Sequence, residues 1–124
     1  MNEVLEKLNP APVKLETKTE IGIEDFAKLD IRVGEVISCE NHPDSDKLLV
    51  SKVQIGPELR TIVSGLRPKF EAKDLMGKKL PVIVNLKPVK LRGILSEGMI
   101  LVGEDQDNLE LIEFKKLSTG SIIR

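Results

Sequence analysis

The stretch that decides the fold reads Asn85-Leu-Lys-Pro-Val-Lys-Leu-Arg-Gly-Ile-Leu-Ser-Glu-Gly-Met99. It follows an apolar run at residues 80–84 and leads into a second one at residues 99–102, so it lies between two expected strands. Two lysines, one arginine and two glycines interrupt its apolar residues. A basic loop of this kind, closed by glycines between two strands, is typical of a protein that binds phosphate groups.

Charge is distributed unevenly along the chain. The 124 residues carry a formal net charge of −1, but residues 60–92 hold nine basic and two acidic side chains. A local positive surplus of this size is the pattern expected for a polyanionic partner. A solvated basic surface without any partner gives the same pattern, and charge alone does not separate the two.

Aromatic residues are scarce. The chain has no Trp or Tyr, and its three Phe are Phe26, Phe70 and Phe114. Proteins that hold single-stranded nucleic acid without sequence preference usually stack its bases on aromatic rings. The composition therefore favours a folded nucleic acid that is recognised by its shape and backbone.

The length and the apolar content fit one globular domain. No apolar run approaches the ~20 residues that cross a bilayer, and the N-terminus lacks the pattern of a signal peptide, so we expect no membrane partner. The single cysteine, Cys39, has no partner for a disulfide within the chain. We therefore expect a reducing, cytoplasmic location.

The alternation of apolar and polar residues predicts mostly strands. The expected strands are 30–40, 48–55, 59–64, 80–84, 98–102 and 109–114, and the expected short helices are 1–8, 23–29 and 71–76. Three strands, one short helix and two more strands is the order of an OB-fold, a five-stranded Greek-key barrel. We predict an all-β protein with an N-terminal arm or linker at residues 1–20, an OB-fold at residues 21–103 and a C-terminal extension at residues 104–124.

The first expected strand has one irregularity. Glu35, next to Gly34, interrupts the alternation, which predicts a bulge or bend at this point. The residues expected to face the core are Ile31, Val33, Ile37 and Cys39.

The chain offers little for metal binding or catalysis. Cys39, His42, Asp44 and Asp46 form the only candidate metal cluster, and it lacks the four good ligands of a zinc site. No nucleophile elbow or phosphate-binding glycine loop is present, and His42 is the only histidine. We expect a core cysteine, a turn histidine, no metal, no cofactor and no catalytic residue, so this chain by itself is not expected to be an enzyme.

Four further residues are candidate ligand contacts. Lys47 stands at the start of a strand, where an ordinary exposed lysine is the alternative, and Arg67 follows the end of another strand. Ser96 and Met99 flank Gly98 and could face a ligand through a hydroxyl and a soft apolar side chain. For Met99, packing in the core is an equal alternative.

Taken in order, four motifs resemble the tRNA-binding domain family. They are Asp30-Ile-Arg-Val-Gly34, His42-Pro-Asp-Ser-Asp-Lys-Leu-Leu49, Arg60-Thr-Ile-Val-Ser-Gly65, and Asn85-Leu-Lys-Pro-Val-Lys-Leu-Arg-Gly93 with Ser96-Glu-Gly-Met99. The family includes the C-terminal domain of bacterial methionyl-tRNA synthetase, small free-standing structure-specific tRNA-binding proteins and the C-terminal domain of a eukaryotic synthetase cofactor. The resemblance covers residues 23–102, about two-thirds of the chain.

This resemblance implies an OB-fold, a homodimer formed by the elements that flank the barrel, and tRNA binding by shape. The implied tRNA contacts are Lys47, Arg67, Asn85, Lys87, Lys90, Arg92, Ser96 and Met99, with Arg32 as a further candidate. The implied dimer contacts in the C-terminal extension are Leu109, Leu111, Ile112, Phe114 and Leu117.

The resemblance therefore predicts a non-catalytic tRNA-binding module that assists an aminoacyl-tRNA synthetase, methionyl-tRNA synthetase in the first place. The chain is then either free-standing or the C-terminal domain or β chain of that ligase, and the sequence leaves both open. The alternative is a chaperone-like protein-interaction module, because a secretion-associated chaperone branch shares the fold. That branch generally lacks the Val-Ser-Gly and Ser-x-Gly-Met elements that this chain retains, which favours tRNA.

Overall fold

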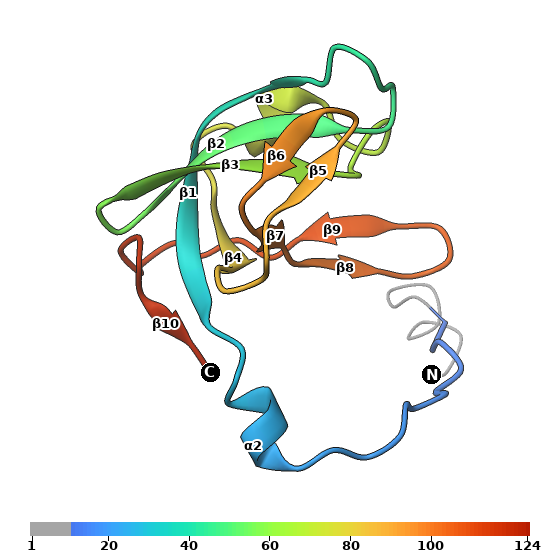
Figure 1. The fold of residues 1–124 in the computed structure, drawn as a ribbon. Coiled ribbons are helices and arrows are strands. Elements are labelled where there is room, and N and C mark those ends of the chain that lie inside the picture. Colours follow the sequence, from blue (N-terminus) through green and yellow to red (C-terminus); the bar gives the residue numbers. More distant parts are fainter. Residues whose placement is uncertain (1–10) are drawn as a thin grey trace.

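The computed structural model of the protein describes residues 11–124 (Figure 1). The helix expected at residues 1–8 lies outside the described residues. The elements are α2 (Ile23–Phe26), β1 (Ile31–Asn41), β2 (Leu49–Ile55), β3 (Glu58–Ser64), α3 (Ala72–Leu75), β4 (Lys79–Ile83), β5 (Val89–Leu91), β6 (Ile94–Ser96), β7 (Met99–Ile100), β8 (Val102–Glu104), β9 (Leu109–Leu111) and β10 (Ile122–Ile123). No helix among the described residues is long and apolar enough to cross a membrane.

A curled antiparallel sheet forms the body of the molecule (Figure 1). Its strands lie in the order β3-β2-β1-β4-β7, and β10 pairs with the start of β1. Strands β2 and β3 form a hairpin, as their spacing in the sequence indicates, with Leu49 opposite Ser64 and Ile55 opposite Glu58. Two separate hairpins, β5–β6 and β8–β9, complete the fold.

The long strand β1 is the centre of the sheet, because it pairs with β2, β4 and β10. The register with β2 shifts between Val36 and Ser38, so the bulge lies slightly beyond the predicted position. Val33 and Val36 are both buried, so the alternation breaks at Gly34 and Glu35, before this shift; Ile37 is 50% exposed, and the prediction that it faces the core is wrong. The presence of glycine at position 34 has a different explanation, because a Cβ at this position would lie only 2.6 Å from Cγ1 of Val53 on β2.

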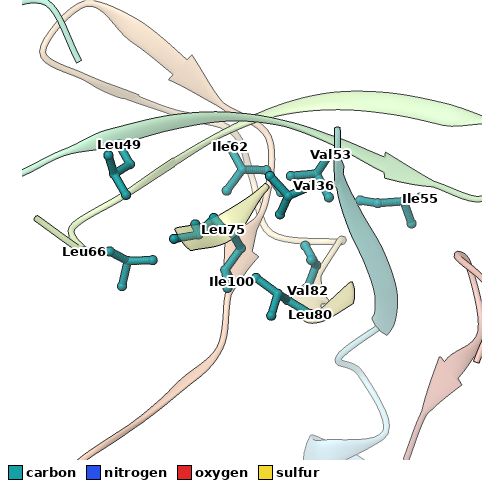
Figure 2. Close-up of a cluster of buried hydrophobic side chains, with 10 residues drawn as sticks. All are labelled: Val36, Leu49, Val53, Ile55, Ile62, Leu66, Leu75, Leu80, Val82 and Ile100. Carbon is teal, nitrogen blue, oxygen red and sulfur yellow. The ribbon is translucent and has the colours of Figure 1, made fainter. Parts of the chain in front are cut away.

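The core lies inside the curled sheet, where ten buried apolar side chains pack together (Figure 2). Helix α3 closes it by placing Leu75 in the cluster, fully buried. The backbone N–H of Glu71 donates to the carboxylate of Asp74, which fixes the first turn of α3. Gly77 ends the helix with φ of +79°, a conformation that glycine adopts without strain, as the sequence predicts.

The two flanks differ in how they join the barrel. Residues 11–20 are exposed and have no regular secondary structure. The predicted strand 98–102 is divided into β7 and β8, and β9 pairs with β8 across the predicted boundary at residue 104. Leu109 and Leu111 of β9 pack against the core of their own chain, while Ile112 and Leu117 are exposed. The domain boundaries and the dimer contacts stay predictions.

Candidate nucleic-acid interface

The basic stretch is a β-hairpin, not the loop that the sequence suggests. Strands β5 and β6 pair from Val89 opposite Ser96 to Leu91 opposite Ile94. The two residues between them, Arg92 and Gly93, both have positive φ, at 51° and 88°. Such a pair of angles matches the right-handed twist of the flanking strands and makes a tight two-residue turn. The hairpin therefore presents its basic residues from a defined backbone.

The base of this hairpin is fixed to β3 by three consecutive residues. Ser96 is 4% exposed, and its Oγ accepts a hydrogen bond from the backbone N–H of Val63 at 2.9 Å and donates to the carbonyl of Gly98 at 3.1 Å. The backbone N–H of Glu97 donates to the carbonyl of Thr61 at 2.8 Å. A Cβ at Gly98 would lie 3.1 Å from a β4 carbonyl oxygen, a tight contact that glycine avoids. Ser96 thus positions the hairpin, and its direct contact with tRNA stays a prediction.

The tip of the hairpin is held by His42, which is 3% exposed. The Nδ1 atom of His42 accepts from the backbone N–H of Asp44 at 3.0 Å, so the proton of the neutral ring is on Nε2. Nε2 then donates to the carbonyl of Leu91 at 3.1 Å. His42 is a turn histidine, as predicted, but the sequence gives no sign of this link. No cluster that could hold a metal ion occurs within residues 11–124.

Two more predicted contacts meet beside this turn. The backbone N–H of Arg67 donates to the carbonyl of Lys47 at 3.3 Å, and the guanidinium of Arg67 donates to the carbonyl of Ser45 at 3.1 Å. Lys47 is exposed and Arg67 is half-buried. Because His42 connects the same turn to the hairpin, Lys47 and Arg67 lie on the segments that adjoin β5 and β6.

The basic residues of segment 60–92 fall into two groups. Arg60, Lys73 and Lys78 form ion pairs with Glu58, Glu71 and Glu113. In contrast Lys87, Lys90 and Arg92 are exposed and make no ion pair with any residue of 11–124. Arg67, Lys69 and Lys79 make no ion pair within these residues either, so the unpaired positive charge includes the hairpin and its approach but is not confined to them.

The side chains of Asn85 and Arg32 form hydrogen bonds to other parts of the same chain. The Asn85 side chain accepts from the backbone N–H of Asp30 at 2.8 Å and donates to the carbonyl of Lys28 at 2.7 Å. It thereby fixes the connection between α2 and β1. Arg32 donates to the carboxylate of Asp30 at 2.7 Å and to the carbonyl of Gly120 at 3.1 Å. Their contacts with tRNA stay predictions.

A cavity of about 310 Å³ lies between the end of β3, the hairpin and β7. Lys87, Ser96 and Met99 line it, so it brings together three of the predicted contacts. Met99 is 44% exposed, so it does not pack as a fully buried core residue. Cys39 lies elsewhere, partly buried against the core, where burial raises the pKa of its thiol and keeps it protonated at neutral pH.

The strand order, the closing helix and the basic hairpin define an OB-like barrel with a basic end. Comparison with known proteins identifies the family within this fold, because residues 31–121 match the family described as "Putative tRNA binding domain". The chain belongs to this tRNA-binding domain family.

Relatives and solved structures agree with this assignment. Over 106 residues the chain is 52% identical to a methionine–tRNA ligase of Deinococcus radiodurans, a match that covers 84% of this chain and 16% of that protein. A crystal structure of a MetRS related protein from Pyrococcus horikoshii is 32% identical with a TM-score of 0.83, covering 86% of this chain and all of that one. A chaperone CsaA from Bacillus anthracis, 24% identical with a TM-score of 0.76 over 86% of this chain and all of that one, has the same fold. The chain spans 13 to 20% of the length of the curated relatives that it matches.

Proposed function

We propose that this chain binds tRNA without catalysis, through the basic end of its barrel. The observation that carries the proposal is the placement of Lys90 and Arg92 on a hairpin fixed at both its base and its tip. Both side chains are exposed and unpaired within residues 11–124, so phosphate groups can neutralise them. Lys47, Arg67 and Lys87 add three positive charges at the same end. A fixed array of cations suits a folded RNA that is read by shape.

The proposal includes the setting of the chain. Its matched relatives are methionine–tRNA ligases. We therefore propose that it serves as an appended or free-standing module that increases the affinity of methionyl-tRNA synthetase for tRNA. A cytoplasmic location follows from that role. The exposed apolar groups Ile112 and Leu117 fit a homodimer contact in the C-terminal extension.

The salt dependence of binding measures the number of phosphate contacts. Each phosphate neutralised on duplex RNA contributes about 0.9 to the slope of log K against log salt, by analogy with DNA. Contacts from Lys47, Arg67, Lys87, Lys90 and Arg92 therefore predict a slope of about −4.5. The double variant Lys90→Ala/Arg92→Ala should bind bulk tRNA more weakly, with a slope reduced by about 1.8.

A matched control is the double variant Lys18→Ala/Lys116→Ala, which removes the same charge from two exposed lysines that form no ion pair within residues 11–124. Fluorescence titration of the three proteins with bulk tRNA at several salt concentrations separates the effects. Equal weakening by both double variants would show that net charge, not the hairpin, determines binding. A chaperone-like module would bind neither tRNA nor an unstructured RNA of equal length.

A further inference from the structure

The cavity beside the hairpin has the composition of a binding pocket rather than of a packing defect. Apolar side chains make most of its wall, from the end of β3 and from both sides of the hairpin: Val63, Leu66, Leu86, Val89, Leu91 and Met99. No acidic residue lines it, and the only charged group in its wall is Lys87. At Gly65 the wall is open, because a Cβ there would meet no atom within 4 Å.

Ser64 is the unusual polar group in this wall. Its Oγ is buried and has no hydrogen-bond partner among the described residues, and it is the one such buried side-chain atom found in residues 11–124. Buried hydroxyls in folded proteins nearly always have a partner, so an unpaired one calls for an explanation. Ser64 itself is partly exposed in the cavity wall, so a rotation of its side chain can present the hydroxyl to a molecule inside. A ligand in the cavity would supply the missing partner.

We propose that the cavity receives one unstacked nucleobase of the bound tRNA, an inference that rests on the proposed function. The flat apolar ring would lie against the aliphatic side chains and Met99, and its polar edge would hydrogen-bond to Ser64. The phosphate next to that base would lie near Lys87. Bases in loops of folded RNA are the ones that proteins extract and read in this way. An apolar peptide side chain would fill the cavity but would use neither the hydroxyl nor the lysine.

The methyl group of Met99 provides a direct test. A base seated on it would move its proton resonance upfield through the ring current, whereas phosphate contacts at the rim would not. No aromatic side chain of residues 11–124 lines the cavity, so the RNA is the natural source of such a shift. Met76, 51% exposed next to α3, does not line the cavity and serves as an internal control. The experiment is NMR of the full chain with ¹³C-methyl-labelled methionine, titrated with bulk tRNA.

Substitution of Ser64 tests the polar half of the proposal. Ser64→Ala should weaken tRNA binding roughly three- to tenfold, the range expected for the loss of one hydrogen bond. The slope of log K against log salt should stay that of the parent, because no phosphate contact is lost. Ser38→Ala, at an exposed position of β1, is the matched control and should bind like the parent.

The outcomes are distinguishable. An upfield shift of Met99 alone, with weaker binding by Ser64→Ala only, supports the proposal. If tRNA binds with the expected salt slope but Met99 does not move upfield, the base pocket is wrong and the proposed function stands. If tRNA does not bind, both are wrong. If an apolar peptide shifts Met99 and tRNA does not, the cavity belongs to protein ligands.

Discussion

Ser64 and Ser96 line the same cavity, and the structure predicts opposite effects of removing their hydroxyls. The Ser96 hydroxyl is the acceptor for the backbone N–H of Val63, which is 5% exposed. In Ser96→Ala that N–H is left buried without a partner, at a cost of about 1–3 kcal/mol in the free energy of unfolding. The Ser64 hydroxyl has no partner to lose within residues 11–124, so Ser64→Ala should leave stability unchanged or raise it.

Urea unfolding of the parent and of both variants measures this difference. For a chain of this length, 1 kcal/mol corresponds to roughly 4 °C in Tm, so Ser96→Ala should unfold about 4–12 °C below the parent in a thermal scan. The m-value should not change, because the surface exposed on unfolding is nearly the same. A Ser96→Ala variant as stable as the parent would refute the assigned hydrogen bond. A Ser64→Ala variant destabilised by ~1 kcal/mol or more would mean that its hydroxyl has a partner after all.

Two further predictions concern the tip of the hairpin and the acidic turn. His42→Ala removes the donor to the carbonyl of Leu91, so hydrogen exchange should speed up in β5–β6 more than in β2–β3, and equal acceleration in both would contradict the link. Hydrogen bonds from the backbone of Asn108 and Asp107 lower the pKa of Asp105. Because this pKa is lower in the folded state than in the unfolded state, its stabilising effect is complete above the ordinary carboxyl pKa and is lost as the pH falls through the lowered value. An acid titration of the Asn108 amide resonance should therefore show the β8–β9 turn loosening, and Asp105→Asn should show no such transition.

Much of the fold can be predicted because its signals are local. The β2–β3 hairpin follows from two alternating runs separated by Gly56 and Pro57, and the end of α3 follows from Gly77. The β5–β6 hairpin is missed because its turn is Arg92-Gly93, which lacks the Asn or Asp that usually marks a two-residue turn. Ile37 is assigned to the wrong face because the alternation is continued unchanged across the irregularity at Gly34 and Glu35, where the inward-facing positions shift by one.

The functional site is harder to predict, because its decisive contacts are far apart in sequence. The basic residues are found from composition alone. The part played by Ser96 depends on a hydrogen bond to a residue 33 positions away, and that of His42 on one 49 positions away. Ser64 gives no signal at all in the sequence, since only a structure shows that its hydroxyl is buried and unpaired.

The basic residues of segment 60–92 serve two separate purposes, and the net charge of the segment does not distinguish them. Arg60 binds Glu58 and donates to the carbonyls of two residues in other segments, so it acts as a structural link between β3, the end of β4 and the base of the hairpin. Lys87, Lys90 and Arg92, on the hairpin and its approach, have no ion-pair partner within residues 11–124, and on the proposed function they would exchange counterions for RNA phosphates. Because hydrogen bonds fix the hairpin at its base and at its tip, the backbone that carries Lys90 and Arg92 has a defined position relative to the barrel. An unstructured strand can adjust its phosphates to any arrangement of cations, whereas a folded RNA matches only one. On the proposed function, the fixed position of the hairpin would therefore contribute to selectivity for shape, and its charge would contribute to affinity.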